Sequence, residues 1–125
     1  MSDLTTVVDT YLSMWNEEDA AARAEIIEQA WARDGRYVDP LLDVSGHAAL
    51  SEMVDGVHAQ FPGQRFRRTT GVDAHHDQVR FGWELVAPDG VVTVAGLDIG
   101  EVDDDGRFRR IVGFFGPVPE DGAAG

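Results

Sequence analysis

The stretch Tyr37-Val38-Asp39-Pro40 places an acidic side chain in apolar surroundings, directly after a helical pattern whose last large apolar residue is Trp31. Proline has no backbone donor and favours an extended conformation in the residue before it, so a short strand is predicted over residues 37–39. An ionised side chain is rarely buried without a partner or a task. Asp39 is therefore either a carboxylate at the edge of a pocket or a turn residue that accepts backbone donors.

Apolar residues at helical spacing on both sides of this stretch predict three helices. The first covers about residues 3–16. The second covers about residues 19–33 and ends at Asp34-Gly35. The third follows a Ser45 cap and stops at Pro62-Gly63.

Beyond the third helix the sequence changes to β-branched and aromatic residues, separated by turn sequences such as Asp73-Ala74. Helices followed by adjacent, turn-linked strands predict an α+β domain with a largely antiparallel sheet. We expect this sheet to curve strongly beneath the helices and to enclose a central cavity. One domain is expected over residues 1–116, with a flexible tail over 117–125. The predicted strands cover residues 64–72, 76–87, 91–101 and 107–115.

The composition is that of an ordinary soluble protein, with 125 residues, 43% of them apolar and 26% charged. The net charge of -13 disfavours binding to nucleic acid or to anionic membranes, which require basic patches. No apolar run approaches the ~20 residues of a membrane span, and no signal peptide is visible. The absence of cysteine excludes disulfides and thiolate chemistry and fits the cytoplasmic location that we expect.

Two further polar residues fall in apolar patterns. Tyr11 lies on the buried face of the first helix, either as an ordinary core tyrosine or with its hydroxyl in the cavity. Asp98 shares one face of its strand with Val94 and Gly96. Asp98 either lines the cavity with Tyr11 and Asp39 or forms a structural ion pair with a buried arginine. The arginines considered for that pair are Arg80, Arg109 and Arg110.

Several motifs carry a resemblance to a known family over nearly the whole chain. The sequence resembles the nuclear transport factor 2-like superfamily, and within it the SnoaL-like and ketosteroid isomerase-like proteins. This resemblance implies a cystatin-like cone with a cavity, and a homodimer in which the Phe114/Phe115 strand offers apolar contact area. The motifs are Val7–Tyr11, Tyr37–Pro40, Gly46–Leu50, Val94–Asp98, Asp105–Arg107 and Gly113–Gly116.

The resemblance to ketosteroid isomerases implies roles for the three polar residues. Asp39 would be the general base, while Tyr11 and a protonated Asp98 would form the oxyanion hole. The reaction would be an isomerisation or an aldol-type cyclisation of a small apolar or cyclic carbonyl compound. Proton transfer and an oxyanion hole suffice for it, so we expect no cofactor. The expected substrate-binding residues are Trp15, Trp31, Tyr37, Phe81, Trp83, Phe115 and His58.

The sequence also departs from the isomerase pattern. Val54 occupies the place of a tyrosine on the third helix, and large aromatic residues reduce the expected cavity below steroid size, so a smaller cyclic or polyketide-like substrate fits equally well. A second hypothesis is a non-catalytic ligand-binding or dimerisation module of the same fold. Epoxide hydrolysis ranks lower, because Gly96 stands where that chemistry requires an arginine.

The remaining acidic and histidine motifs give weaker signals. His47 is an alternative acid or base near Asp39, although an exposed position at the helix start is the preferred interpretation. Adjacent His75 and His76 would point to opposite faces of a strand and could not easily share an ion. The run Asp103–Gly106 lacks the further ligands of a calcium loop and predicts a hairpin turn. We expect no metal site.

Overall fold

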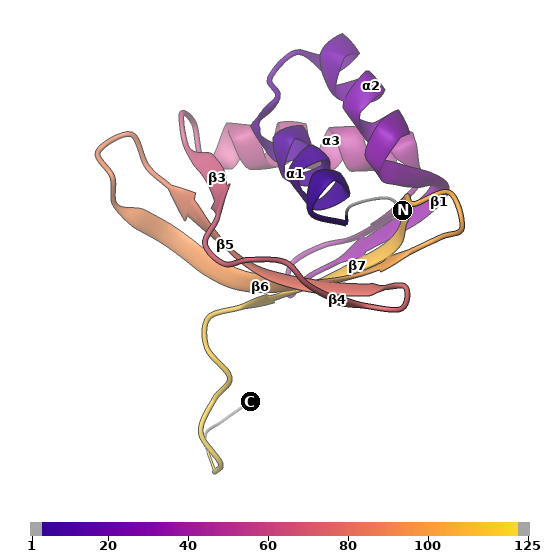
Figure 1. Ribbon diagram of the computed structural model, residues 1–125. Coiled ribbons are helices and arrows are strands. Elements are labelled where there is room, and N and C mark those ends of the chain that lie inside the picture. Colours follow the sequence, from indigo (N-terminus) through magenta and orange to yellow (C-terminus); the bar gives the residue numbers. More distant parts are fainter. Residues whose placement is uncertain (1–3, 123–125) are drawn as a thin grey trace.

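The computed structural model describes residues 4–122 as three helices packed against one face of a curved, seven-stranded sheet (Figure 1). This arrangement confirms the predicted α+β class. No helix within 4–122 is long and apolar enough to cross a membrane. The elements are α1 (Leu4–Asn16), α2 (Ala20–Ala30), β1 (Trp31–Val38), β2 (Asp43–Ser45), α3 (His47–Gln60), β3 (Arg65–Arg68), β4 (Asp73–His75), β5 (Gln78–Val86), β6 (Val92–Val102) and β7 (Phe108–Phe115).

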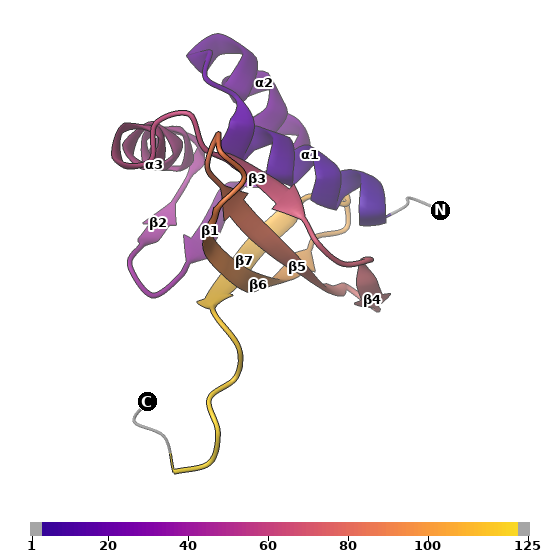
Figure 2. The ribbon, with the colours of Figure 1, turned by 90° about the vertical axis from the view of Figure 1, so that its left-hand side faces the viewer.

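The sheet is mixed and open rather than wholly antiparallel. Its strand order is β2-β1-β7-β6-β5-β3, and β4 also pairs with β5. All pairs are antiparallel except β1 with β7, which run parallel and are separated in the chain by α3 and five strands. Figure 2 shows α1 and α2 lying over the concave face of the sheet. The segment after β7 leaves the sheet on the side opposite the helices (Figure 1).

The second helix is shorter than predicted, because Trp31 belongs to β1 and not to the helix. Asp19 caps the start of α2, where its side chain accepts a hydrogen bond from the amide of Ala22 at 2.9 Å. Trp31 is already extended and pairs with Phe108 of β7 in the core. Asp34-Gly35, the predicted helix end, lies inside β1 at an irregularity in this pairing. A sheet partner distant in sequence overrides the helical spacing.

Three other predicted features also change. Ser45 ends β2, and Gly46 takes the N-cap position of α3 with a φ of 88° that favours glycine and without a side-chain capping bond. The predicted strand over 64–72 is reduced to Arg65–Arg68. Asp73-Ala74, predicted as a turn, lies in the short strand β4. These differences leave the order of helices and strands unchanged.

A fully buried arginine fixes α3, which forms one wall of the cavity described below. Arg23 of α2 donates to the backbone oxygens of Glu17 and Ser51 at 2.7–3.1 Å. It also forms an ion pair with Asp55 at 2.8 Å. Since Glu17 follows α1 and Ser51 lies in α3, this one side chain joins all three helices.

Candidate functional site

A cavity of about 470 Å³ opens between α1, α3, the loop after β1 and the concave face of the sheet. Most of its wall is apolar, as in small-molecule sites generally. The polar residues that α1, the sheet and the start of the loop after β1 contribute to this wall are Tyr11, Tyr37, Asp39, Trp83 and Asp98. The structure therefore brings the three residues singled out from the sequence to one cavity.

Asp98 of β6 is buried, with a relative exposure of 2%, and accepts two hydrogen bonds. The Tyr11 hydroxyl donates to its Oδ2 at 2.8 Å, and Nε1 of Trp83 donates to its Oδ1 at 3.0 Å. Burial raises the pKa of Asp98 to about 7, against the two hydrogen bonds, which lower it, and with a smaller upward contribution from Asp39. Both protonation states are thus accessible near neutral pH.

The alternative hypothesis, an ion pair between Asp98 and an arginine, is wrong. Within residues 4–122, the hydrogen-bond partners of Asp98 are Tyr11 and Trp83. Arg80 instead forms an ion pair with Asp73. Arg109 forms ion pairs with Asp77 and Glu101. No cation therefore neutralises Asp98 in the described part of the chain.

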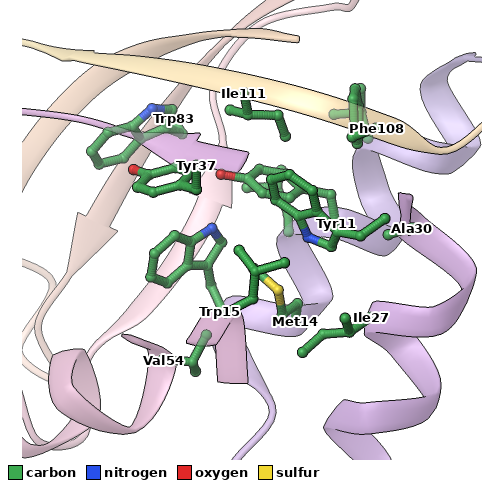
Figure 3. Close-up of a cluster of buried hydrophobic side chains, with 14 of the residues drawn as sticks. Tyr11, Met14, Trp15, Ile27, Ala30, Tyr37, Val54, Trp83, Phe108 and Ile111 are labelled. Carbon is green, nitrogen blue, oxygen red and sulfur yellow. The ribbon is translucent and has the colours of Figure 1, made fainter. Parts of the chain in front are cut away.

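Aromatic rings hold Tyr11 in place. The ring of Tyr11 is fully buried, with edge contacts to Trp31 and Phe108 at centroid distances of 5.7 Å. Figure 3 shows the hydroxyls of Tyr11 and Tyr37 directed toward the Trp83 side of this cluster. Burial and the charge of Asp98 raise the pKa of Tyr11 well above its ordinary value, so its hydroxyl stays protonated.

Asp39 follows β1, and its carboxylate both accepts backbone donors in the turn and lines the cavity, as the two interpretations of the sequence predicted. Its Oδ1 accepts from the backbone amides of Leu41 and Leu42, each at 2.8 Å, as a turn residue before proline would. Its Oδ2 accepts from the Tyr37 hydroxyl at 2.8 Å and belongs to a side chain that lines the cavity. Burial, followed by the nearby charges of Asp98 and Asp39, raises the pKa of Tyr37. Tyr37 is therefore a donor that orients the carboxylate.

A glycine lets the two acidic groups approach each other. Gly113 of β7 lies opposite Asp98 in the sheet register. A Cβ on Gly113 would lie 2.8 Å from Oδ1 of Asp98, 3.2 Å from the Tyr37 hydroxyl and 3.4 Å from Cβ of Asp39. Any larger residue would force these groups to move, so Gly113 maintains the spacing of the polar cluster.

The structure divides the predicted substrate-binding residues into two groups. Trp15, Tyr37, Trp83 and Phe115 line the cavity. Trp31 and Phe81 lie in the hydrophobic core instead. The His58 ring bonds the backbone oxygen of Trp15 at 2.7 Å and does not line the cavity.

The other histidines also lie apart from the cavity wall. Nε2 of His47 is within 3.2 Å of the backbone oxygens of Trp31 and Ala32. His75 and His76 bring their Nδ1 atoms to 3.1 Å from each other. Among residues 4–122 there is no group of three or more acidic or histidine side chains that could hold a metal ion.

Four residues that line the cavity were not predicted from the sequence. Two are the exposed polar residues Glu52 and Gln60 of α3, and two are Leu41 and Leu42 of the loop after β1. Helical spacing places Glu52 on the same side of α3 as Gly56 and Gln60. The sequence shows this spacing, but the apolar stripe of the third helix was the only face of that helix used to predict the core.

Solved structures share the cystatin-like fold of this chain. A protein with a cystatin-like fold from Methylobium petroleophilum PM1 matches with a TM-score of 0.73 and 18% identity, covering 97% of this chain and 80% of that one. A candidate SnoaL-like polyketide cyclase from Jannaschia sp. CCS1 matches with a TM-score of 0.66 and 18% identity, covering 92% and 89%. At these identities the similarity concerns the fold alone.

The particular family follows from closer matches. The family model of the SnoaL-like domain matches residues 8–111. A candidate isomerase of the SnoaL-like family from Agrobacterium tumefaciens shares 38% identity with a TM-score of 0.85, covering 90% of this chain and 96% of that one. The chain therefore belongs to the SnoaL-like family. No protein with a curated function matches it in sequence.

Proposed function

We propose that this protein is an enzyme that moves a proton on a small apolar carbonyl compound, as an isomerase or an aldol-type cyclase. The observation that carries the proposal is that Asp39 and the Tyr11–Asp98 pair line the same apolar cavity. The similarity to candidate isomerases and cyclases of this family supports the same class of reaction. The chemistry needs a base and a site that stabilises negative charge on oxygen, and it needs no cofactor.

In the proposed reaction, Asp39 removes a proton from the carbon next to the carbonyl. The electron pair of that C–H bond moves toward the carbonyl oxygen and forms an enolate. For isomerisation of an unsaturated substrate, the carboxylic acid of Asp39 returns the proton to another carbon of the conjugated enolate. For cyclisation, the enolate carbon attacks a second carbonyl, the π electrons of that carbonyl move to its oxygen, and the resulting alkoxide takes the proton from Asp39. Tyr37 holds Oδ2 of Asp39 by its hydrogen bond at 2.8 Å, and a carboxylate oxygen has a further lone pair for the substrate proton.

The protonation state of Asp98 determines which donor reaches the enolate oxygen. When Asp98 is ionised, the Tyr11 hydroxyl donates to it at 2.8 Å. When Asp98 is protonated, its own O–H can donate to the Tyr11 oxygen, and the Tyr11 proton is then free to donate to the substrate. A pKa of about 7 keeps the protonated form of Asp98 populated at neutral pH, and we propose that this form is the active one, because it frees the Tyr11 proton for the substrate.

The experiment that tests the proposal does not require the natural substrate. Wild-type protein is incubated with β-tetralone in deuterium oxide, and proton exchange at the carbons beside the carbonyl is followed by NMR. We expect exchange above the buffer rate, and a decrease of about 10²-fold or more in Asp39→Asn, the usual contribution of a general base. Asp43→Asn is the matched control, because Asp43 is an exposed residue of β2.

If Asp39→Asn retains both its circular dichroism spectrum and its exchange rate, Asp39 is not the base. The alternative function is a binding module without catalysis. It is favoured by the three hydrogen bonds that Asp39 already accepts and by the engagement of Tyr11 with Asp98. Binding of β-tetralone to the wild type without exchange would support this alternative.

We also propose that a second copy of the chain covers the outer face of the sheet. Half-buried or exposed apolar residues gather there, away from the helices, and a twofold contact between two copies would cover them. Sedimentation velocity tests the proposal: a dimer is expected for the wild type and a monomer for Phe114→Lys, and a monomeric wild type would refute it. The residues concerned are Leu97, Ile99, Val112 and Phe114.

A further inference from the structure

The indole of Trp83 lies across the neighbouring strand and reaches Asp98. Trp83 of β5 is paired with Gly96 of β6, and Asp98 lies two residues further along β6, on the same face of the sheet. A Cβ on Gly96 would lie 2.4 Å from Cζ2 and 2.8 Å from Cε2 of the indole, so the ring needs a glycine beneath it. Nε1, which is bonded to Cε2, donates to Oδ1 of Asp98 at 3.0 Å. The strand register thus brings an indole donor to one oxygen of the buried acid.

The indole is held in this orientation by its surroundings. Trp83 has a relative exposure of 5%. The ring of Phe66 packs beside it at a centroid distance of 5.6 Å, and the ring of Phe115 makes an edge contact at 6.0 Å. An indole N–H is a donor and has no acceptor function. Oδ1 of Asp98 must therefore offer a lone pair to Trp83, whether the acid is ionised or neutral.

The two oxygens of Asp98 become different when the acid binds a proton. Oδ1 faces a group that only donates, whereas Oδ2 faces the Tyr11 hydroxyl at 2.8 Å, which can donate or accept. The carbonyl oxygen of a neutral carboxylic acid is its better acceptor. A proton on Oδ2 leaves that carbonyl oxygen to Trp83 and gives Tyr11 a donor. A proton on Oδ1 would place a hydroxyl beside the indole N–H and keep the Tyr11 proton engaged with Oδ2.

We infer that Trp83 is a positioning residue that places the proton of neutral Asp98 on Oδ2, so that the Tyr11 hydroxyl is free to donate into the cavity. The inference rests on the proposed function and deepens it, because it names the group that controls the donor of the same site. Trp83 performs this role through Asp98 and Tyr11, and its N–H needs no contact with the substrate.

Trp83 has a second effect on Asp98, which gives the inference a distinctive signature. Burial raises the pKa of Asp98 to about 7, and the hydrogen bonds from Tyr11 and Trp83 lower it. Trp83 thus makes the neutral acid less abundant and, at the same time, directs its proton to the productive oxygen. Removal of the indole N–H should therefore increase the amount of neutral Asp98 and decrease its effectiveness. A loss of packing alone would not produce both changes.

Two measurements on Trp83→Phe test the inference. NMR titration of ¹³C-labelled aspartate carboxyl groups gives the pKa of Asp98 without any ligand, and the Asp98 signal is identified by its absence in Asp98→Asn. We expect the pKa to rise by about one unit in Trp83→Phe, because a donor to the ionised acid is lost. Exchange of β-tetralone at about pH 6, where Asp98 is mostly neutral in both proteins, should fall by about tenfold, the scale of one hydrogen bond.

Two further variants separate the lost donor from changes in packing. Trp83→β-(3-benzothienyl)alanine replaces N–H by sulfur and keeps the shape of the ring, so it should show the same two effects. Trp31→Phe is the matched control, because Trp31 is fully buried and its Nε1 has no hydrogen-bond partner among residues 4–122. This control should leave the pKa of Asp98 unchanged.

An unchanged or lowered pKa of Asp98 in both Trp83 variants would overturn the inference, and so would an unchanged exchange rate at about pH 6. Failure of the proposed function shows itself separately, as a wild type that does not exchange β-tetralone. The inference is then decided by the pKa of Asp98 and by the infrared C=O frequency of bound β-tetralone, which a free Tyr11 donor should make lower in the wild type than in Trp83→Phe. Equal frequencies would refute it.

Discussion

Burial of Asp98 makes the stability of the protein depend on pH in a direction opposite to that of most acidic residues. Folding raises its pKa from 3.8 to about 7, so the folded state holds the proton more tightly than the unfolded state. Between these two values the folded state carries more bound protons, and the free energy of unfolding decreases as the pH rises. The decrease stops above about pH 7, where Asp98 is ionised in both states.

The size of the effect follows from the shift in pKa. A shift of about three units corresponds to roughly 4 kcal/mol of stability lost between about pH 4 and pH 7. Asp98→Asn should abolish this component, because an amide imitates the neutral acid: its oxygen can accept from Trp83 and its NH₂ group can donate to the Tyr11 oxygen. At about pH 8 the variant should therefore be more stable than the wild type by an amount of this order.

Urea denaturation followed by tryptophan fluorescence, from about pH 5 to about pH 8.5, measures the effect. The quantity of interest is the difference between wild type and variant at each pH, because contributions from the histidines cancel in it. Asp43→Asn is the control: Arg36 lowers the pKa of Asp43, so this carboxylate titrates below the window. Parallel curves for wild type and Asp98→Asn would refute the reasoning, since they would mean that Asp98 has the same pKa in both states.

Three further predictions concern single side chains. Gly113→Ala should destabilise the protein by about 1–3 kcal/mol in urea denaturation, because the new Cβ would lie 2.8 Å from Oδ1 of Asp98. Gly56→Ala is the control and should not destabilise the protein, because nothing lies within 4 Å of a Cβ at that position. Equal effects of the two substitutions would contradict the role given to Gly113. Arg23→Met should lower the free energy of unfolding by about 3 kcal/mol in thermal and urea denaturation, because the backbone oxygens that Arg23 contacts lose their hydrogen-bond donor. An unchanged free energy of unfolding would show that water replaces the guanidinium. Tyr37→Phe should keep the fold but slow β-tetralone exchange about tenfold, because Asp39 loses its orienting donor, and an unchanged rate would exclude that role.

The sequence predicted the class of fold because two kinds of signal agreed along the chain. Helical spacing identified three helices, and alternation with turn residues identified the later strands. The prediction failed where a distant partner decides the structure. Trp31 fits the spacing of the helix before it, but pairing with Phe108 draws it into β1. The sequence around residue 31 does not predict a strand that pairs with β7 in parallel.

The candidate site was also predicted only in part. Tyr11, Asp39 and Asp98 were found because polar groups stood out in apolar patterns. The donor from Trp83 to Asp98 and the close approach at Gly113 could not be found this way, since both depend on the register between neighbouring strands. Glu52 was overlooked for a different reason: it is an exposed residue of α3, and its position beside the cavity depends on how α3 packs on the sheet.

The hydrogen bond between Tyr11 and Asp98 connects residues separated by 87 positions, and it has a consequence for how such a protein changes over generations. The bond anchors the first helix on the sheet, yet the acid within it weakens the fold at neutral pH. Selection for robustness alone would favour a neutral amide at position 98. If function requires a proton to come and go at this position, an opposing selection retains the acid. Laboratory evolution for thermal tolerance, with no demand on activity, would reveal that pressure as the early loss of Asp98.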